Sequence, residues 1–249
     1  MIEPGSVDEL IQRRVRYERF VLALRTGRPV MTIATIALCV AVYFVEGAFG
    51  GAEDGHVLLA LGASWPDGYP NELWRLGSAM FLHGGLAHLA MNMYSLYVVG
   101  PFVERAFGRA AFLGLYGASG LAGFALSAQF GGHLSVGASG AIFGCFAAMP
   151  VAMLRMRRDL PGQLVRRVLQ NAALVIGLNF AYGLSSSNID NWGHLGGLAC
   201  GALLSLVVPI VARGDEAPAG VQAALALPGV VALGCLAADA ANVLTRLGR

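Results

Sequence analysis

The sequence predicts an all-α polytopic membrane protein, and three observations support that prediction. The chain of 249 residues is 56% hydrophobic and only 13% charged, with a mean hydropathy of +0.63. Soluble domains carry about 25% charged residues, so most of this chain must face lipid or other helices. Apolar runs of about 20 residues, the length that crosses a bilayer, recur along it. The arginines gather between alternate runs.

Six apolar runs of about spanning length are followed by a seventh. They cover residues 30–50, 80–103, 110–130, 138–154, 166–184, 191–212 and 220–244. Pro29 suits the first turn of the first helix, where a backbone N–H is not needed. Arg105 closes the second run and Arg109 opens the third. The fourth run is short and ends before Arg155, and Pro228 weakens the seventh.

The basic residues, all of them arginine, predict the orientation. With the N-terminus in the cytoplasm, fourteen of the 17 arginines fall on the cytoplasmic side. These are Arg13, Arg14, Arg16, Arg19, Arg25, Arg28, Arg105, Arg109, Arg155, Arg157, Arg158, Arg166, Arg167 and Arg213. Basic residues favour the cytoplasmic side of membrane proteins. We therefore expect a multi-pass protein with a cytoplasmic N-terminus, and the net charge of +2 adds nothing to this.

Residues 1–28 form a basic segment before the first span. Leu10, Val15, Phe20 and Val21 lie among its arginines. This pattern is typical of an amphipathic helix at a membrane surface. A solvated basic tail explains the same pattern equally well.

Two polar side chains lie at matching depth in two spans. Ser139 opens the fourth span within Gly137-Ala-Ser-Gly140, and His194 opens the sixth within Gly193-His-Leu-Gly-Gly. Both spans begin at the outer face, so the hydroxyl and the imidazole share a depth and can meet. A serine and a histidine within reach of each other can act as nucleophile and general base.

A second Gly-Ala-Ser-Gly, at residues 117–120, offers a competing serine. Ser119 lies about ten residues into its span, or ~15 Å at the helical rise per residue, near the bilayer midplane. It is therefore too deep to meet His194. We interpret it as a small residue at a helix crossing.

Small residues predict close packing of the fourth and sixth spans. Gly140 and Gly144 lie four apart on one span, and Gly197 and Gly201 on the other, so the two backbones can approach closely. Phe143, one turn below the serine, is placed to pack against the imidazole, although ordinary core packing would also explain it. A lone histidine could simply bond a neighbouring helix, but intramembrane ionisable groups are costly and usually functional.

His88 and Asn92 are four residues apart and share one face of the second span. Two uncharged donors aimed into the same cavity suit an oxyanion hole, alongside the backbone N–H of Ser139. The rival interpretation is a metal site made of His83, His88 and His194. No HExxH motif is present and no carboxylate joins the three histidines, so we expect neither metal nor cofactor.

Taken together, these motifs resemble the rhomboid intramembrane serine proteases. The resembling stretch runs from about residue 58 to residue 209 and keeps the motifs in the family's order. It contains Leu73-Trp74-Arg75, Phe81-Leu82-His83 through His88 to Asn92, Val103-Glu104-Arg105, Tyr116 to Gly120, Gly137 to Gly144, and Gly193-His194 with Gly197 and Gly201. Only one tryptophan precedes Arg75, where two are common. That departure concerns loop packing and not chemistry.

For the fold, the resemblance implies a rhomboid-like core of six transmembrane helices within residues 29–213. It also implies a first outer loop, about residues 51–79, that lies sideways in the membrane and carries Trp74 and Arg75. Residues 214–249 look like a linker and the additional C-terminal helix that some members carry.

For the site, the resemblance implies a dyad of Ser139 as nucleophile and His194 as general base and acid. His88 and Asn92 would stabilise the oxyanion. The family supplies no acid to orient the histidine, so we interpret Asp190, one turn before it, as a loop or interface residue.

The expected function is that of a serine endopeptidase cutting in or near transmembrane segments of membrane proteins. Its partners would be such substrates and the lipid bilayer, with no nucleic acid, and the sequence indicates no oligomeric state. We expect a bacterial inner (plasma) membrane, with the site opening toward the outer face. Two alternatives remain. One is a catalytically silent relative that binds membrane clients. The other is a small transporter or channel, which would show charged or internally repeated half-segments, and the sequence shows neither.

Overall fold

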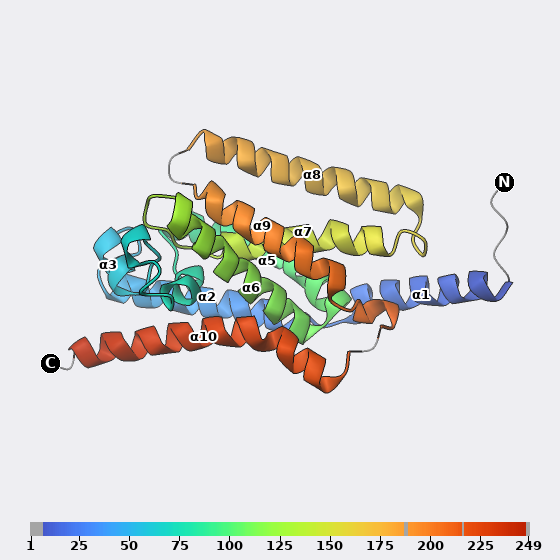
Figure 1. The fold of residues 1–249 in the computed structure, drawn as a ribbon, viewed down its shortest axis with the longest axis horizontal. Helices are drawn as coiled ribbons and strands as arrows, with labels where there is room; N and C mark the ends of the chain where they lie inside the picture. The colour runs from blue at the N-terminus through green and yellow to red at the C-terminus, as the bar shows by residue number, and fades with distance from the viewer. Residues whose placement is uncertain (1–6, 187–188, 216, 248–249) are drawn as a thin grey trace.

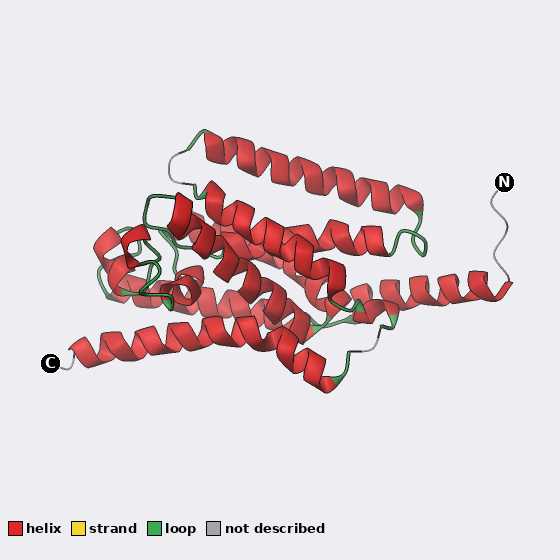
Figure 2. Cartoon of the chain, in the orientation of Figure 1, coloured by secondary structure: helices red, strands yellow, loops and turns green. Residues whose placement is uncertain are grey.

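The computed structural model describes residues 7–186, 189–215 and 217–247, and this part is built of helices joined by loops (Figures 1 and 2). The long helices are α1 (Val7–Thr26), α2 (Val30–Ala48), α5 (Leu86–Phe107), α6 (Arg109–Phe130), α7 (Ser139–Arg155), α8 (Gly162–Leu184), α9 (Asn191–Val207) and α10 (Ala219–Leu247). The short ones are α3 (Gly55–Ala60), η1 (Pro66–Gly68), α4 (Arg75–Ser78), η2 (Ala79–Phe81) and η3 (Val211–Arg213). Residues 1–6 of the basic segment and 248–249 of the C-terminal segment lie outside the described residues.

Five helical segments among the described residues are long and apolar enough to cross a membrane. They are Val7–Ala48, Leu86–Phe107, Arg109–Phe130, Asn191–Arg213 and Ala219–Ala238. Together with the helical architecture they confirm the predicted class, an all-α polytopic membrane protein. Helix α7 is apolar but has only 17 residues, and α8 carries two arginines within its first two turns. The count of seven spans therefore stays a prediction.

The second span begins later than predicted. We expected helix from residue 80, but α5 begins at Leu86. Before it, η2 ends at Phe81, Leu82 is extended, and Gly85 has a φ of +116°. Side chains disfavour that backbone conformation, so a glycine is needed there. Counting apolar residues missed the break, because the Gly84-Gly85 pair interrupts the helix without adding polarity.

Prolines set two other boundaries. Val208 precedes Pro209 and is extended, with φ −62° and ψ 131°, as a residue before proline prefers. Helix α9 therefore ends at Val207 instead of the predicted residue 212, and a short helix, η3, follows only from Val211. Helix α8 begins directly after Pro161, four residues before the predicted start.

Helix α6 is central to the bundle and packs against α7, α9 and α10 (Figure 1). Glycines permit this close approach. A Cβ on Gly117 would lie 2.5 Å from the Gly229 nitrogen of α10, and one on Gly123 would lie 2.6 Å from the Gly193 oxygen at the start of α9. The same helix thus supports the C-terminal helix on one face and the start of α9 on another.

The basic N-terminal segment is helical over Val7–Thr26. Phe20, 1% exposed, anchors it in the core. Arg16 donates two hydrogen bonds, of 3.0 and 2.8 Å, to the Asp159 carboxylate in the turn after α7. The sequence allowed either an amphipathic helix or a solvated tail here, and the structure contains a helix. Its place at a membrane surface stays a prediction.

Candidate active site

Ser139 is the first residue of α7, and the loop before it has little freedom. Gly137 has a φ of +119°, and its N–H donates to the Ala79 carbonyl at 2.9 Å. Two residues earlier, Ser135 pairs with Ser64 through backbone hydrogen bonds of 3.1 and 2.8 Å. This loop is therefore attached on both sides of Val136 to the segment between α2 and α5, which sets where the Ser139 hydroxyl can lie.

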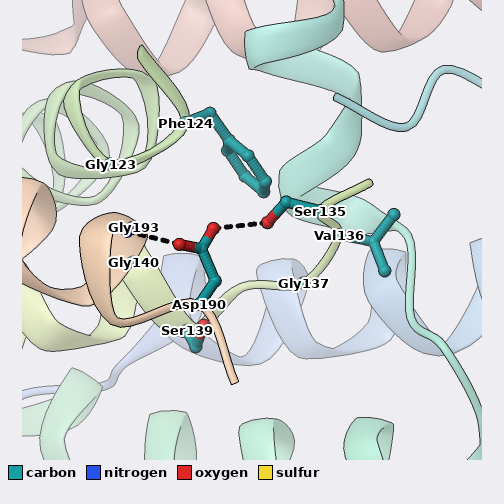
Figure 3. A pocket seen from close by; sticks show the side chains of 9 residues that line it. All are labelled: Gly123, Phe124, Ser135, Val136, Gly137, Ser139, Gly140, Asp190 and Gly193. Carbon is teal, nitrogen blue, oxygen red and sulfur yellow. Dashed lines mark hydrogen bonds between the residues drawn. The ribbon is translucent and has the colours of Figure 1, made fainter. Parts of the chain in front are cut away.

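His194 lies in the first turn of α9, and Asp190 caps that helix. The Asp190 carboxylate accepts from the Gly193 N–H at 2.8 Å and from the Ser135 hydroxyl at 2.5 Å (Figure 3). Because Ser135 belongs to the loop before α7, this one carboxylate connects the starts of α7 and α9. It is a helix cap and interface group, the kind of role that the sequence suggested for it.

The structure brings the hydroxyl and the imidazole together. His194 Nε2 and Ser139 Oγ are 2.9 Å apart, a hydrogen-bond distance. His194 is 8% exposed and Ser139 is half-buried. Among the described residues, no group bonds His194 Nδ1. The two atoms are thus in place for proton transfer, with no acid on the far ring nitrogen in the described part of the chain.

Two aromatic rings hold the His194 imidazole. Phe143 stacks on it with ring centroids 4.2 Å apart and planes 16° apart. Phe180, from α8, meets the ring edge-on at 6.4 Å and also contacts Phe143 at 5.7 Å. Phe143 was expected near the imidazole from its spacing to Ser139. Phe180 was not, because one aromatic residue in an apolar span carries no signal of its partner.

Glycine contacts below the pair explain its geometry. A Cβ on Gly197 would collide with the Gly140 carbonyl oxygen, and one on Gly201 would collide with the backbone of Gly144. The α7 and α9 backbones are therefore in direct contact, as the spacing of these four glycines suggests. Ser119 is fully buried against Gly144, away from the imidazole.

His88 and Asn92 lie against the loop that precedes Ser139. A Cβ built on Gly137 would be 2.7 Å from His88 Nε2 and 3.8 Å from Asn92 Nδ2. The Gly84 N–H donates to His88 Nδ1 at 3.3 Å, so Nδ1 is an acceptor and the ring proton belongs on Nε2. Asn92 Nδ2 donates one hydrogen to the His88 carbonyl at 3.0 Å, and its second hydrogen is available for another acceptor. Both side chains can donate toward the Gly137 region.

Trp74 and Arg75 belong to the segment between α2 and α5, the predicted first outer loop. The Arg75 guanidinium lies 4.5 Å from the centre of the Trp74 ring and bonds the Glu72 carboxylate at 2.7 Å. It also donates to the carbonyls of Leu59 and Ala63, at 2.7 and 3.2 Å. The described contacts of Arg75 connect distant parts of this segment. They suit a role in holding the fold and not a role in the reaction.

A small pocket opens beside the pair (Figure 3). Ser139, Asp190, Ser135 and Phe124 are among its lining residues, and its volume is about 10 Å³. That is about the space of one water molecule. Ser135 was missed by sequence analysis, because a serine in a loop next to a small-residue motif has no distinguishing pattern.

The fold and this arrangement define a class of protein: a polytopic membrane protein with a serine–histidine pair at one end of its helical bundle. The chain belongs to the rhomboid family. The family's domain model, described as the Rhomboid domain, matches residues 70–210. That stretch includes the pair and both candidate oxyanion donors.

Similar curated proteins carry protease names. The chain is 39% identical over 178 residues to "Rhomboid protease GluP" of Bacillus subtilis, covering 71% of this chain and 34% of that protein. It is 30% identical over 210 residues to "Rhomboid protease AarA" of Providencia stuartii, covering 74% of each. "Putative rhomboid protease YdcA" of B. subtilis is 38% identical over 146 residues, 55% of this chain and 67% of that protein. The chain thus spans about a third of GluP and three quarters of AarA.

Proposed function

We propose that this protein is an intramembrane serine endopeptidase that hydrolyses peptide bonds in or near transmembrane segments of membrane proteins. The observation that carries the proposal is the 2.9 Å contact between His194 Nε2 and Ser139 Oγ. The protease names of similar family members support the same reaction.

In the proposed reaction, Ser139 Oγ attacks the carbonyl carbon of the scissile bond while His194 Nε2 takes the hydroxyl proton. The C–N bond then breaks, and His194 returns that proton to the leaving amine. Water attacks the acyl-enzyme with His194 again as base, releasing the acid and restoring Ser139. The stacked Phe143 ring supports this role, since it limits how far the imidazole can turn.

The tetrahedral intermediate needs donors at its negative oxygen. His88 Nε2, Asn92 Nδ2 and the Ser139 backbone N–H are the proposed ones. The first two lie beside Gly137, two residues before the nucleophile, and a glycine there leaves room for them. Removing one such donor typically costs about 10²–10³ in rate.

The substrate backbone must be exposed before it can be cut. A transmembrane helix hides its peptide groups in its own hydrogen bonds, so segments with glycine or proline near the cut should unwind more cheaply. Family resemblance adds a small residue just before the cut. Entry past α8 suits the structure, because only Val165, Ala172 and Gly183 of that helix are buried. We propose that the active site opens toward the outer face, as the arginine distribution suggests, and that the membrane is a bacterial inner membrane.

Cleavage of a panel of single-span reporter proteins tests the proposal. The purified protein, reconstituted in lipid vesicles, should cut a subset of reporters at sites mapped by mass spectrometry, and Ser139→Ala should abolish every cut. If folded wild-type protein binds reporters but leaves all of them intact, it is a client-binding relative and the proposal is wrong. Cleavage that survives Ser139→Ala would refute the assigned nucleophile.

A further inference from the structure

Glu46 is a buried carboxylate to which the proposed reaction gives no part. It lies in the last turn of α2 and is 0% exposed. A negative charge at a helix C-terminus is disfavoured by the helix dipole, and a charge within a membrane bundle is costly. Glu104, by contrast, meets the N-terminus of the same helix, where it accepts from the Met31 and Thr32 N–H groups at 2.9 and 2.8 Å. Helix stability explains Glu104 but not Glu46.

The contact that Glu46 makes leads toward the candidate site. Its Oε1 accepts the backbone N–H of His83 at 3.0 Å. His83 is also fully buried, with its ring centre 5.3 Å from that of His88. A turn follows directly, because the Gly85 N–H donates to the His83 carbonyl at 2.9 Å. The carboxylate thus holds the first residue of the turn that enters α5.

That turn determines which nitrogen of His88 carries the proton. The Gly84 N–H, one residue beyond the Glu46 contact, donates to His88 Nδ1 at 3.3 Å. With Nδ1 engaged as acceptor, the neutral ring carries its hydrogen on Nε2. Nε2 and the adjacent Cε1 form the ring edge nearest Gly137, each 2.7 Å from where a Cβ on Gly137 would lie. A free turn at residues 83–85 would release this constraint on the tautomer.

We propose that Glu46 is a positioning residue for the oxyanion donor: by holding the His83 N–H it fixes the Gly84 N–H on His88 Nδ1 and keeps the His88 proton on Nε2. The inference rests on the proposed function. Glu46 itself touches no reacting atom and acts through the turn at residues 83–85. The property that matters is its hydrogen-bond acceptor, so an amide oxygen at this position should serve nearly as well as a carboxylate.

Three variants of the full chain test this with the reporter cleaved fastest. Glu46→Leu removes the acceptor, and Glu46→Gln keeps an oxygen for the His83 N–H. Ser78→Ala is the matched control, because it deletes another buried hydrogen bond of the outer loop, to the Gly62 carbonyl. We expect Glu46→Leu to lower kcat at least about tenfold and to leave KM within about twofold of the wild type. This loss of kcat should be smaller than the loss of about 10²–10³-fold caused by deleting an oxyanion donor. Glu46→Gln and Ser78→Ala should stay within about threefold of wild-type kcat.

Wild-type kcat in Glu46→Leu, or equal losses in Glu46→Leu and Glu46→Gln, would overturn the inference. A nitrogen-15 spectrum of labelled histidines gives a second readout that needs no cleavage. His88 Nδ1 should be unprotonated in the wild type and should share the proton with Nε2 in Glu46→Leu. Identical His88 signals in both would also overturn it. An inactive wild type whose His88 tautomer still changes in Glu46→Leu would refute the proposed function, and would leave standing only that Glu46 sets the His88 tautomer.

Discussion

At the scale of single residues, the candidate site depends on groups whose positions are fixed by their neighbours. Ser139 and His194 stand at the first turns of α7 and α9. Asp190 connects the starts of these helices by accepting from Ser135 and Gly193. The imidazole is held by stacking on Phe143. In the described part of the chain, no carboxylate bonds its Nδ1. Local packing thus takes the orienting part that an aspartate has in a triad.

Gly137 offers a test at this scale. In Gly137→Ala, the new Cβ would meet His88 Nε2 and Cε1 at 2.7 Å and would also strain a φ of +119°. We expect reporter cleavage to fall about 10²-fold, as for loss of one oxyanion donor. Gly132→Ala is the matched control, since Gly132 also has a positive φ, +74°, but has open space around it. Rates of cleavage and melting temperatures of both variants separate collision with His88 from backbone strain. Equal activity in the two variants would contradict the placement of His88.

At the scale of elements, glycine faces decide how close the helices come. The sequence alone predicted the close contact of α7 and α9 through paired glycines and the meeting of Ser139 with His194, and the structure contains both contacts. The depths in the membrane from which we argued this stay predictions. The sequence could not reveal the break before Leu86, because glycine interrupts a helix without changing its hydropathy. Nor could it reveal Phe180 or Glu46, whose partners lie on other helices. Contacts between distant segments leave no periodic pattern in either segment.

The contact between α7 and α9 predicts the effect of one added methyl group. Gly197→Ala would drive its Cβ into the Gly140 carbonyl and separate the helices that carry the pair. Overpacking of this kind costs about 1–3 kcal/mol. Both the melting temperature in detergent and reporter cleavage should fall. In Gly177→Ala, on α8, the Cβ meets nothing within 4 Å, so that variant should resemble the wild type. A stable, fully active Gly197→Ala would contradict the backbone contact.

At the scale of the whole molecule, the bundle is closed by contacts between segments far apart in the chain. Helix α10 packs on α6, and a Cβ on Gly77 of α4 would meet the Cys235 sulfur of α10 at 2.9 Å. At the other end, the Asp159 side chain is 3% exposed and pairs with Arg16 of α1 at 2.8 Å and with Arg213 of η3 at 3.5 Å. The N-terminal helix is therefore part of the folded body.

Asp159→Asn tests that closure. Loss of the charged partner should destabilise the protein by about 1.5–3 kcal/mol, the range for hydrogen bonds to charged groups. Glu18→Gln is the comparison, because its pair with Arg14 is exposed and should contribute less than about 1 kcal/mol. Thermal unfolding in detergent and protease sensitivity of residues 7–26 would measure both. If Asp159→Asn unfolds no earlier than Glu18→Gln, the α1 contact does not hold the helix.

The most direct measurement of the central claim is covalent labelling by a fluorophosphonate probe, with the modified residue identified by peptide mass spectrometry. The label should be found on Ser139 in the wild type and in Ser119→Ala, and should be lost in Ser139→Ala. In His194→Ala the labelling rate should fall about 10²–10⁴-fold, the usual contribution of a general base. Labelling of a folded Ser139→Ala protein at Ser119, or an unchanged rate in His194→Ala, would contradict the account.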